Sequence, residues 1–416
     1  MRPQNIARNK FMNASKKAEK YLKTFCSVKP NRSTGSTGNQ RATSFFTKVI
    51  KSHSYQVKTD YFDCLDFRVG KTFLKHKNRF FEIYPSPFSL GYKVKSELIT
   101  VSSVNELSKC NCERKILLMK GEICAEQLMP KNFIFYNPEH HKKIYSLLET
   151  KKPAVIITAT EPKPALVGAI YPFPLIEDGD FDIPNCYCDK AVGDKLASYK
   201  GEIFELNMKA KRILTKACNV VARKNPQGNE KILIYAHIDA RASTPGASDN
   251  ASGVVVLLLL AEMLSDYHGD SCIEIVALNG EDHYSVAGQM NYLKHNQQSF
   301  NKIILSINID DVGYKKGKTS YTLYQCSGQT TQLVKKVFSK HMELIEGEPW
   351  YNGDHMIFAQ NYVETIALTS ASSAFLMENI THTQKDKPDI INFEKLVEIA
   401  AALKDLILNF KLGRKT

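Results

Sequence analysis

Histidine and carboxylate side chains follow three apolar segments of this chain, where they could bind metal ions or transfer protons. They are His237 after segment 232–236, Glu281 and Asp282 after 273–278, and Asp310 and Asp311 after 303–309. A further histidine, His382, lies in a polar stretch near the end of the sequence. Imidazole and carboxylate ligands suit zinc or a similar divalent ion. A single acidic strand end is weak evidence. Three strand ends that carry His, Glu-Asp and Asp-Asp, together with a late histidine, predict a metal centre.

The spacing His237-x-Asp239 places two polar groups on the same side of an extended chain, because side chains two residues apart share a face. The carboxylate can then accept a hydrogen bond from the second ring nitrogen of the histidine. Such a bond fixes the tautomer of the ring and strengthens it as a ligand. We therefore count Asp239 with the catalytic group as the residue that supports His237.

Asp249 precedes an almost wholly apolar segment, 254–261, which predicts a buried helix. Aspartate is favoured at helix N-termini, so a simple capping role is one interpretation. A charged carboxylate at the mouth of a buried helix needs a partner, however, and its two oxygens could bridge a pair of metal ions. Both interpretations stay open from the residues alone.

Glu281 and Asp282 are adjacent carboxylates at the end of an apolar strand, and they divide naturally into two roles. One would bind metal, while the other would stay free to take a proton from a metal-activated water. A solvated acidic loop is the bland alternative. It is weakened because the strand that ends before Asp310 carries acids in the same way.

Two further choices concern neighbouring residues. Asp311 alternates with Asp310 along the chain and should point away from it, so Asp310 is the preferred ligand. In the segment Gly353-Asp354-His355, the aspartate fits a helix cap, whereas His355 is a candidate substrate contact.

The elements that must position these residues alternate between apolar strands and helices from about residue 203. The apolar segments lie at 232–236, 254–264, 273–278, 303–309, 333–338, 363–368 and 393–408. This alternation predicts an α/β fold, a mixed and largely parallel sheet with helices on both faces. Ligands bind beyond the carboxyl ends of the strands in such a sheet, which is where the polar residues lie.

The sequence predicts three segments, at 1–66, 67–202 and 203–416. The first contains two amphipathic helices without strands of their own, so they are expected to pack on the third, the catalytic domain. The middle segment has short apolar runs, among them 133–136, between proline-rich turns, and it predicts a smaller β-rich domain inserted into the other. Its adjacent His140 and His141 are expected at the surface.

Composition is that of an ordinary globular protein, with 43% hydrophobic and 24% charged residues. The net charge of +13 is concentrated in the first sixty residues, without aromatic interleaving or a motif that would indicate nucleic-acid binding. The longest apolar run, 254–261, is too short for a membrane span. The first residues lack the apolar core of a signal peptide, so a cytoplasmic protein is expected.

Taken together, these motifs resemble the M28 family of co-catalytic zinc peptidases over residues 230–410. The matching motifs are His237-x-Asp239, the run PGASDNASG at 245–253, Asn-Gly-Glu-Asp at 279–282, Asn-Ile-Asp at 308–310 and a late histidine. The resemblance implies the zinc aminopeptidase fold, with hydrolysis of the N-terminal bond of peptides that have a free N-terminus. The insert at 67–202 is similar in position and strand pattern to the protease-associated domain of many members.

The resemblance also implies a role for each residue. His237 and Asp310 would complete one metal site, Asp282 and His382 would complete the other, and Asp249 would bridge the two. Glu281 would be the general base, which activates the water and passes the proton to the leaving amine. The implied cofactors are two Zn²⁺ ions, with Co²⁺ or Mn²⁺ as substitutes. His382 is preferred to His355 as a ligand mainly because of this resemblance.

The chain departs from the common family pattern in three places. Asp282 stands where many members have Glu, the segment after Glu281 differs by one residue, and Thr381 stands where some members have a Tyr that helps to hold the oxyanion. Two other functions are consistent with the scaffold: a glutaminyl-cyclase-like aminoacyl transferase with one metal, or a catalytically dead binding protein. Retention of all five ligands argues against both.

Overall fold

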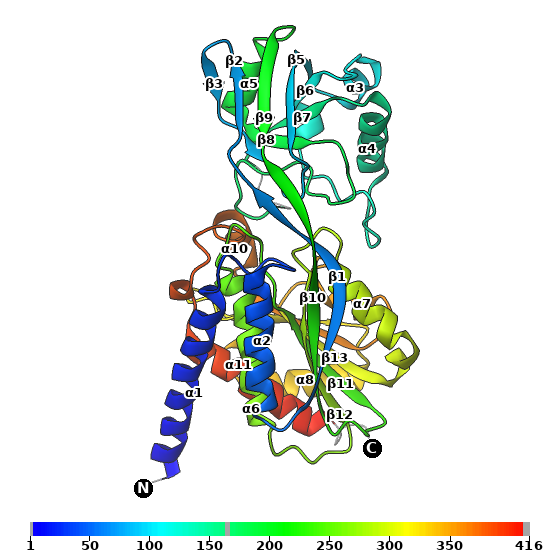
Figure 1. The fold of residues 1–416 in the computed structure, drawn as a ribbon. Helices are drawn as coiled ribbons and strands as arrows, with labels where there is room; N and C mark the ends of the chain where they lie inside the picture. The colour runs from blue at the N-terminus through cyan, green and yellow to red at the C-terminus, as the bar shows by residue number, and fades with distance from the viewer. Residues whose placement is uncertain (1–2, 163–166, 411–416) are drawn as a thin grey trace. The chain divides into compact units, whose positions relative to one another are not determined.

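The computed structural model describes residues 3–162 and 167–410, which form two compact units (Figure 1). Unit 1 contains the described residues up to Asp63, together with Lys216–Leu376 and those from Ile380 onward. Unit 2 contains Cys64–Thr215 and Met377–Asn379. All of the candidate residues that follow the apolar strands therefore lie in unit 1.

An eight-stranded sheet forms the centre of unit 1. Its strands are β1 (Gln56–Val69), β10 (Ala210–Lys224), β11 (Lys231–His237), β12 (Cys272–Leu278), β13 (Ile303–Ile309), β14 (Thr319–Tyr324), β15 (Leu344–Glu346) and β16 (Thr365–Ser370). They are ordered β1-β10-β12-β11-β13-β16-β14-β15. β11, β12, β13 and β16 are mutually parallel, whereas β10 and β14 run antiparallel to their inner neighbours. The mixed, largely parallel sheet predicted from the sequence is confirmed.

Helices cover both faces of this sheet, because successive strand side chains point into two different apolar cores. The first core contains α1 (Pro3–Cys26), α2 (Thr37–Lys51), α6 (Gly253–Met263), α8 (Gly328–Phe338) and α11 (Phe393–Phe410). The second contains α7 (Ala287–Asn296) and α9 (His355–Ala359). In β11, Ile234 faces the first core, and Leu233 and Tyr235 face the second. The two N-terminal helices thus pack in the first core of unit 1.

The connecting segments of unit 1 hold its short helices, η2 (Ala247–Ser252), η3 (Gln297–Lys302), η4 (Pro388–Ile390) and α10 (Ser373–Asn379), the last of which ends in unit 2. Helix α6 is buried from Gly253 to Ala261, which confirms the buried helix predicted after Asp249. Among the described residues, none of the helices combines the length and the apolar character that a membrane span requires.

Unit 2 is built on a second eight-stranded sheet, ordered β3-β2-β9-β5-β6-β7-β8-β4. Its strands are β2 (Phe73–His76), β3 (Arg79–Phe81), β4 (Tyr84–Pro85), β5 (Tyr92–Val101), β6 (Ile116–Lys120), β7 (Val155–Thr160), β8 (Asn185–Asp189) and β9 (Ile203–Met208). Its helices are α3 (Val104–Lys109), η1 (Gly121–Cys124), α4 (Glu139–Lys151) and α5 (Lys190–Ala197). β9 pairs with β2 and β5, so this sheet continues past residue 202. The apolar run at 133–136 is a loop in which Ile134 and Tyr136 are exposed.

A buried ion-pair network stabilises the sheet of unit 1. Glu274 of β12 is fully buried, and its carboxylate contacts Lys231 at 3.0 Å, the hydroxyl of Tyr292 at 2.6 Å and the guanidinium of Arg223. Burial alone would raise the pKa of Glu274, but Lys231 and Arg223 hold it below its ordinary value. Because the folded pKa is depressed, the stabilisation is present above the unfolded pKa of about 4.3 and is lost as the pH falls through the folded pKa.

Glu274→Gln is therefore expected to lower the free energy of unfolding by about 3 kcal/mol at pH 7, because removing one partner leaves buried charge uncompensated. The difference from the parent protein should shrink as the pH falls below the unfolded pKa of about 4.3, and it should be smallest below the depressed folded pKa, where the parent carboxylate is also neutral. Urea unfolding at pH 7 and at a series of values from about pH 5 downward measures this change, with Glu348→Gln at an exposed position as the control. Equal free energies of unfolding at pH 7 would contradict this account.

Candidate metal centre

Three neighbouring parallel strands of unit 1 end at the same edge of the sheet, and candidate residues follow each of them. β11 pairs in parallel with both β12 and β13. His237 is the last residue of β11, Glu281 and Asp282 follow the turn after β12, and Asp310 follows β13 directly. This is the edge at which α/β sheets bind their ligands.

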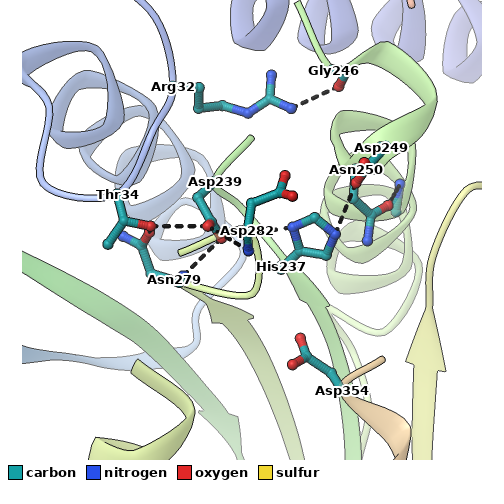
Figure 2. A network of polar contacts seen from close by, with 12 residues as sticks. Arg32, Thr34, His237, Asp239, Gly246, Asp249, Asn250, Asn279, Asp282 and Asp354 are labelled. Carbon is teal, nitrogen blue, oxygen red and sulfur yellow. Dashed lines mark hydrogen bonds and ion pairs between the residues drawn. The ribbon is translucent and has the colours of Figure 1, made fainter. Parts of the chain in front are cut away.

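One group of potential ligands consists of His237, Asp249 and Asp310. The imidazole Nε2 of His237 lies 3.1 Å from Oδ1 of Asp249 and 3.4 Å from Oδ1 of Asp310. The three ligand atoms lie within 4.8 Å of one another, and Figure 2 shows Asp249 beside the imidazole. Oδ1 of Asp310 is buried and lacks a hydrogen-bond partner among the described residues. This orphaned acceptor is placed where a cation would satisfy it.

A second group consists of Asp249, Asp282 and His382. Nε2 of His382 lies 3.0 Å from Oδ2 of Asp249 and 3.2 Å from Oδ1 of Asp282. His382 follows α10 with a positive φ of 64°, and its carbonyl accepts a hydrogen bond from the hydroxyl of Ser243 at 2.9 Å. Asp249 thus presents one carboxylate oxygen to each histidine, so the two groups share this residue.

The distances in both groups fit a divalent metal ion. Zinc binds nitrogen and oxygen at about 2.0–2.2 Å, so the ligand atoms of a tetrahedral site lie roughly 3.3 Å apart. The four separations that involve the histidine Nε2 atoms run from 3.0 to 3.4 Å. The donors are imidazoles and carboxylates, the set that zinc accepts in hydrolytic sites. The residues present therefore fit a pair of such ions.

Carboxylates dominate the electrostatics of the centre. Burial alone would lower the pKa of His382, but the carboxylates of Asp282 and Asp249 raise it to about 10. In the same way, Asp310 outweighs burial and raises the pKa of His237 well above its ordinary value. Burial opposes the charge of Asp249, yet the two histidines hold its pKa below its ordinary value. The centre stabilises positive charge at both Nε2 atoms, which is where a metal ion would replace the proton.

The adjacent acids Glu281 and Asp282 differ in their surroundings. Asp282 contacts His382, and Arg241 donates its backbone N–H to Asp282 Oδ2 at 3.1 Å. Glu281 lies in a third group with His237 and Asp282, whose ligand atoms are within 4.8 Å of one another. Burial raises the pKa of Glu281 well above its ordinary value, with His237 opposing and Asp282 adding to the rise. A carboxylate whose pKa is raised in this way binds a proton more strongly than an ordinary glutamate does, as a general base must.

Asp239 supports the centre in a different way from the one its spacing predicts. Its Oδ1 lies 3.6 Å from Nδ1 of His237, which is longer than a hydrogen bond, and that nitrogen lacks a hydrogen-bond partner among the described residues. Instead, its oxygens accept the backbone N–H groups of Gly280 at 2.8 Å and Asp282 at 3.1 Å, and the hydroxyl of Thr34 at 2.9 Å. Asp239 thereby fixes the turn that carries both acids.

The segment that presents Asp249 is held by side chains distant in the sequence. Asp249 lies inside η2 with φ −109° and ψ 93°, and Ser252 occupies the N-cap position of α6, so the capping interpretation of Asp249 is wrong. The buried carboxylate of Asp386 accepts the N–H groups of Ser248 at 2.7 Å and Asp249 at 3.1 Å. Asn250 donates to the carbonyl of Ile309 at 2.8 Å, which links η2 to the strand end before Asp310.

The alternative residues lie outside these groups. Asp311 has a positive φ of 51°, so the chain turns immediately after Asp310, and Asp311 is in none of the groups found among the described residues. His355 is buried, with Nε2 at 2.9 Å from the carbonyl of Trp350 and its ring against the indole at 4.1 Å. Burial lowers the pKa of His355 to about 4. This is the environment of a core histidine, and its substrate role stays a prediction.

Asp354 is an acid of the centre that the sequence suggested only as a helix cap. It occupies the N-cap position of α9 but makes no capping hydrogen bond. Figure 2 shows Asp354 on the side of His237 away from Asp239, and Asp354 and His237 interact electrostatically. Its Oδ1 accepts a hydrogen bond from Gln289 at 2.9 Å, and its Oδ2 lacks a hydrogen-bond partner within the described part of the chain. Burial raises the pKa of Asp354 to about 7. Asp354 follows a glycine and not an apolar strand, so the sequence gave no sign that its carboxylate would lie near the proposed ligands.

A fourth group, in unit 2, does not suit a metal ion. Nε2 of His140 and of His141 lie 2.8 and 3.2 Å from the same oxygen of Glu126. Nδ1 of His141 accepts the backbone N–H of Met129 at 3.1 Å, so in the neutral ring Nε2 carries the proton and donates to the carboxylate. The expectation that both histidines lie at the surface is wrong for His141, which helix α4 buries.

Comparison with known proteins matches residues 219–407 to the model of Peptidase family M28. Aminopeptidase YwaD of Bacillus subtilis is 25% identical over 234 residues, which are 54% of this chain and 50% of that protein. The uncharacterised protein YfbL of Escherichia coli is also 25% identical, over 46% of this chain and 71% of that protein. The chain therefore spans about half of the length of YwaD and 71% of the length of YfbL.

Solved structures of similar fold cover nearly all of the chain. An aminopeptidase from Aneurinibacillus sp. strain AM-1 has a TM-score of 0.72 at 20% identity, covering 95% of this chain and 93% of its own. A zinc aminopeptidase from Bacillus subtilis has a TM-score of 0.73 at 18% identity, covering 95% of both chains. The fold of these proteins thus includes both units found in this chain.

Proposed function

We propose that this chain is a member of peptidase family M28, whose model matches residues 219–407, and that it is an aminopeptidase with a pair of zinc ions. His237 and Asp310 would hold one ion, His382 and Asp282 would hold the other, and Asp249 would bridge them. The observation that carries this proposal is the position of Asp249, whose two oxygens face the Nε2 atoms of two different histidines at 3.1 and 3.0 Å.

Bound zinc would supply Lewis-acid polarisation of the scissile carbonyl and would lower the pKa of an attacking water. Glu281 takes the proton of that water as general base and delivers it to the amine that leaves. Its position beside His237 and Asp282 supports this role, and its pKa, which burial raises above the ordinary value, makes the carboxylate a stronger base than an exposed glutamate. Asp239 holds the turn before Asp282, so that the base and the neighbouring ligand keep their separate orientations.

We propose peptides with a free N-terminus as the substrates. This proposal is supported by the relationship to the B. subtilis aminopeptidase YwaD and by the excess of buried carboxylates in the centre, which would attract the α-ammonium group of such a peptide. A glutaminyl-cyclase-like transferase with one metal is the second candidate. The shared carboxylate favours the peptidase, because a single-metal reaction gives Asp249 no second ion to bind.

The purified chain is expected to contain two zinc ions and to release the N-terminal residue from aminoacyl p-nitroanilides and short peptides. N-acetylated versions of the same substrates should be inert. A strong chelator should abolish the hydrolysis, and added Zn²⁺ or Co²⁺ should restore it. Elemental analysis and a chromogenic assay measure these outcomes. Hydrolysis without bound metal, cleavage of blocked substrates, or cyclisation of N-terminal glutamine as the main reaction would overturn the proposal.

A further inference from the structure

A short N-terminal segment reaches the metal centre from outside the region matched to the family. Arg32, Thr34 and Asn39 are almost completely buried, and each bonds to a segment that carries the proposed ligands or the base. Figure 2 shows Arg32 beside Gly246 and Thr34 beside Asp239. The match to the family begins only at residue 219. We propose that Thr34 and Arg32 are positioning residues of the metal centre, an inference that rests on the proposed function.

Thr34 acts through Asp239. Its hydroxyl donates to Oδ2 of Asp239 at 2.9 Å, while that carboxylate accepts the N–H groups on either side of Glu281. Three donors therefore hold a fully buried anion in one orientation. Without the hydroxyl, Asp239 would lose the one donor that comes from outside the turn, so the turn and its carboxylate could shift together. The orientation of Asp282 would then be less well defined.

Arg32 acts on the loop before Asp249. Its guanidinium donates to the carbonyls of Pro245 at 3.0 Å and Gly246 at 2.6 Å. Gly246 has a positive φ of 61°, and a Cβ atom there would lie 2.7 Å from Nη2 of Arg32, so the close contact requires glycine. The carboxylate of Asp386 holds the N–H groups of the same loop. The bridging aspartate is thus fixed by a cation on one side and an anion on the other.

Asn39 completes the arrangement at the strand end. Its side-chain amide and that of Asn279 form two reciprocal hydrogen bonds of 2.9 Å. Asn279 directly precedes the turn that carries the base, and its backbone N–H is held separately by Asn219 at 3.0 Å. The segment therefore contacts both the turn with Glu281 and the loop with Asp249. Neither of these two parts of the centre lies on a regular strand.

Purely structural packing would predict a loss of stability in the variants without a selective loss of metal affinity. The test compares Thr34→Val, which removes the donor at nearly constant volume, with Thr34→Ser, which keeps it. Thr43→Val is the matched control, because Thr43 is a buried threonine of α2 whose hydroxyl bonds to carbonyls of its own helix. Arg32→Lys provides a second variant, which keeps the charge but loses the forked donor.

Zinc affinity is measured for each full-length variant by competition with a chromophoric chelator, and the metal-free proteins are unfolded in urea. Thr34→Val is expected to bind zinc about 10- to 100-fold more weakly, the range for a lost hydrogen bond behind a metal ligand, and Arg32→Lys about 10-fold more weakly. Thr34→Ser and Thr43→Val should bind like the parent. In peptide hydrolysis by the zinc-loaded protein, kcat should fall for Thr34→Val while KM stays nearly unchanged.

If Thr34→Val binds zinc as tightly as the parent protein, the inference is overturned while the proposed function stands. An equal loss of affinity in the serine and valine variants would have the same consequence. A loss of affinity that parallels the loss of urea stability across all four variants would do the same, because packing would then explain it. A parent chain that binds no zinc would overturn both this inference and the proposed function.

Discussion

Glu281→Gln is expected to lower kcat for peptide hydrolysis by about 10³-fold while the chain keeps two zinc ions. Glutamine has nearly the same size and polarity as glutamate, but it cannot accept a proton at neutral pH. The turn that carries Glu281 is fixed by its backbone N–H groups and Asp239, so the substitution leaves the neighbouring ligand Asp282 in place. The loss should therefore appear in the chemical step, with little change in KM.

Steady-state kinetics and elemental analysis of the same preparation measure the two halves of this prediction. Glu348→Gln is the matched control, since it makes the same chemical change at an exposed position outside the metal-ligand groups. Loss of zinc from Glu281→Gln would reassign the residue as a ligand. Full activity with two zinc ions would exclude Glu281 as the base, and Asp354, an acid of raised pKa that is not one of the proposed ligands, would become the candidate.

The residues at the strand ends were predictable because each strand is marked by a continuous apolar segment in the sequence. Apolar segments at 232–236, 273–278 and 303–309 fall within β11, β12 and β13, and parallel strands bring their carboxyl ends to one edge. A polar residue after each strand therefore becomes part of one site. The spacing of His237 and Asp239 also predicted that their side chains lie together, and Nδ1 and Oδ1 do approach each other, although at 3.6 Å the contact is longer than the expected hydrogen bond.

The supports of the centre could not be predicted, because they join residues that are far apart in the sequence. Thr34 and Asp239 are 205 residues apart, and Arg32 and Gly246 are 214 apart. Threonine and arginine in a segment rich in Ser, Thr and Gly indicate a loop, and nothing in that composition distinguishes a buried loop from an exposed one. Asp386 likewise gave no signal, since its partners are backbone N–H groups, which every sequence has.

Local rules also failed where tertiary contacts decide the backbone. Asp249 fits a helix N-cap by residue type, but η2 separates it from α6 and gives it an extended conformation. The run at 133–136 has the composition of a strand, yet it is a loop of unit 2 with exposed side chains. In both cases the residue type was compatible with several conformations. For Asp249, the carboxylate of Asp386 and the carbonyl of Ile309 hold the segment in the observed one.

The shared carboxylate makes Asp249→Asn the most informative ligand substitution. Asparagine keeps the size of the side chain, but it offers one carbonyl oxygen and an amide group that cannot bind a cation. Only one of the two histidines would then face an oxygen of residue 249, whereas both do so now at 3.1 and 3.0 Å. We expect the zinc content to fall from two ions to one or none.

With Asp249→Asn, kcat/KM should fall by at least about 10³-fold, because both the polarisation of the carbonyl and the acidification of water depend on the metal pair. Elemental analysis after dialysis against micromolar zinc, together with the p-nitroanilide assay, measures the loss. Asp311→Asn is the comparison, since this neighbouring acid lies in none of the ligand groups and should leave two ions bound. Two zinc ions in Asp249→Asn would show that the ions do not share this residue. Loss of zinc from Asp311→Asn but not from Asp249→Asn would mean that the turn after Asp310 brings the carboxylate of Asp311 to the metal.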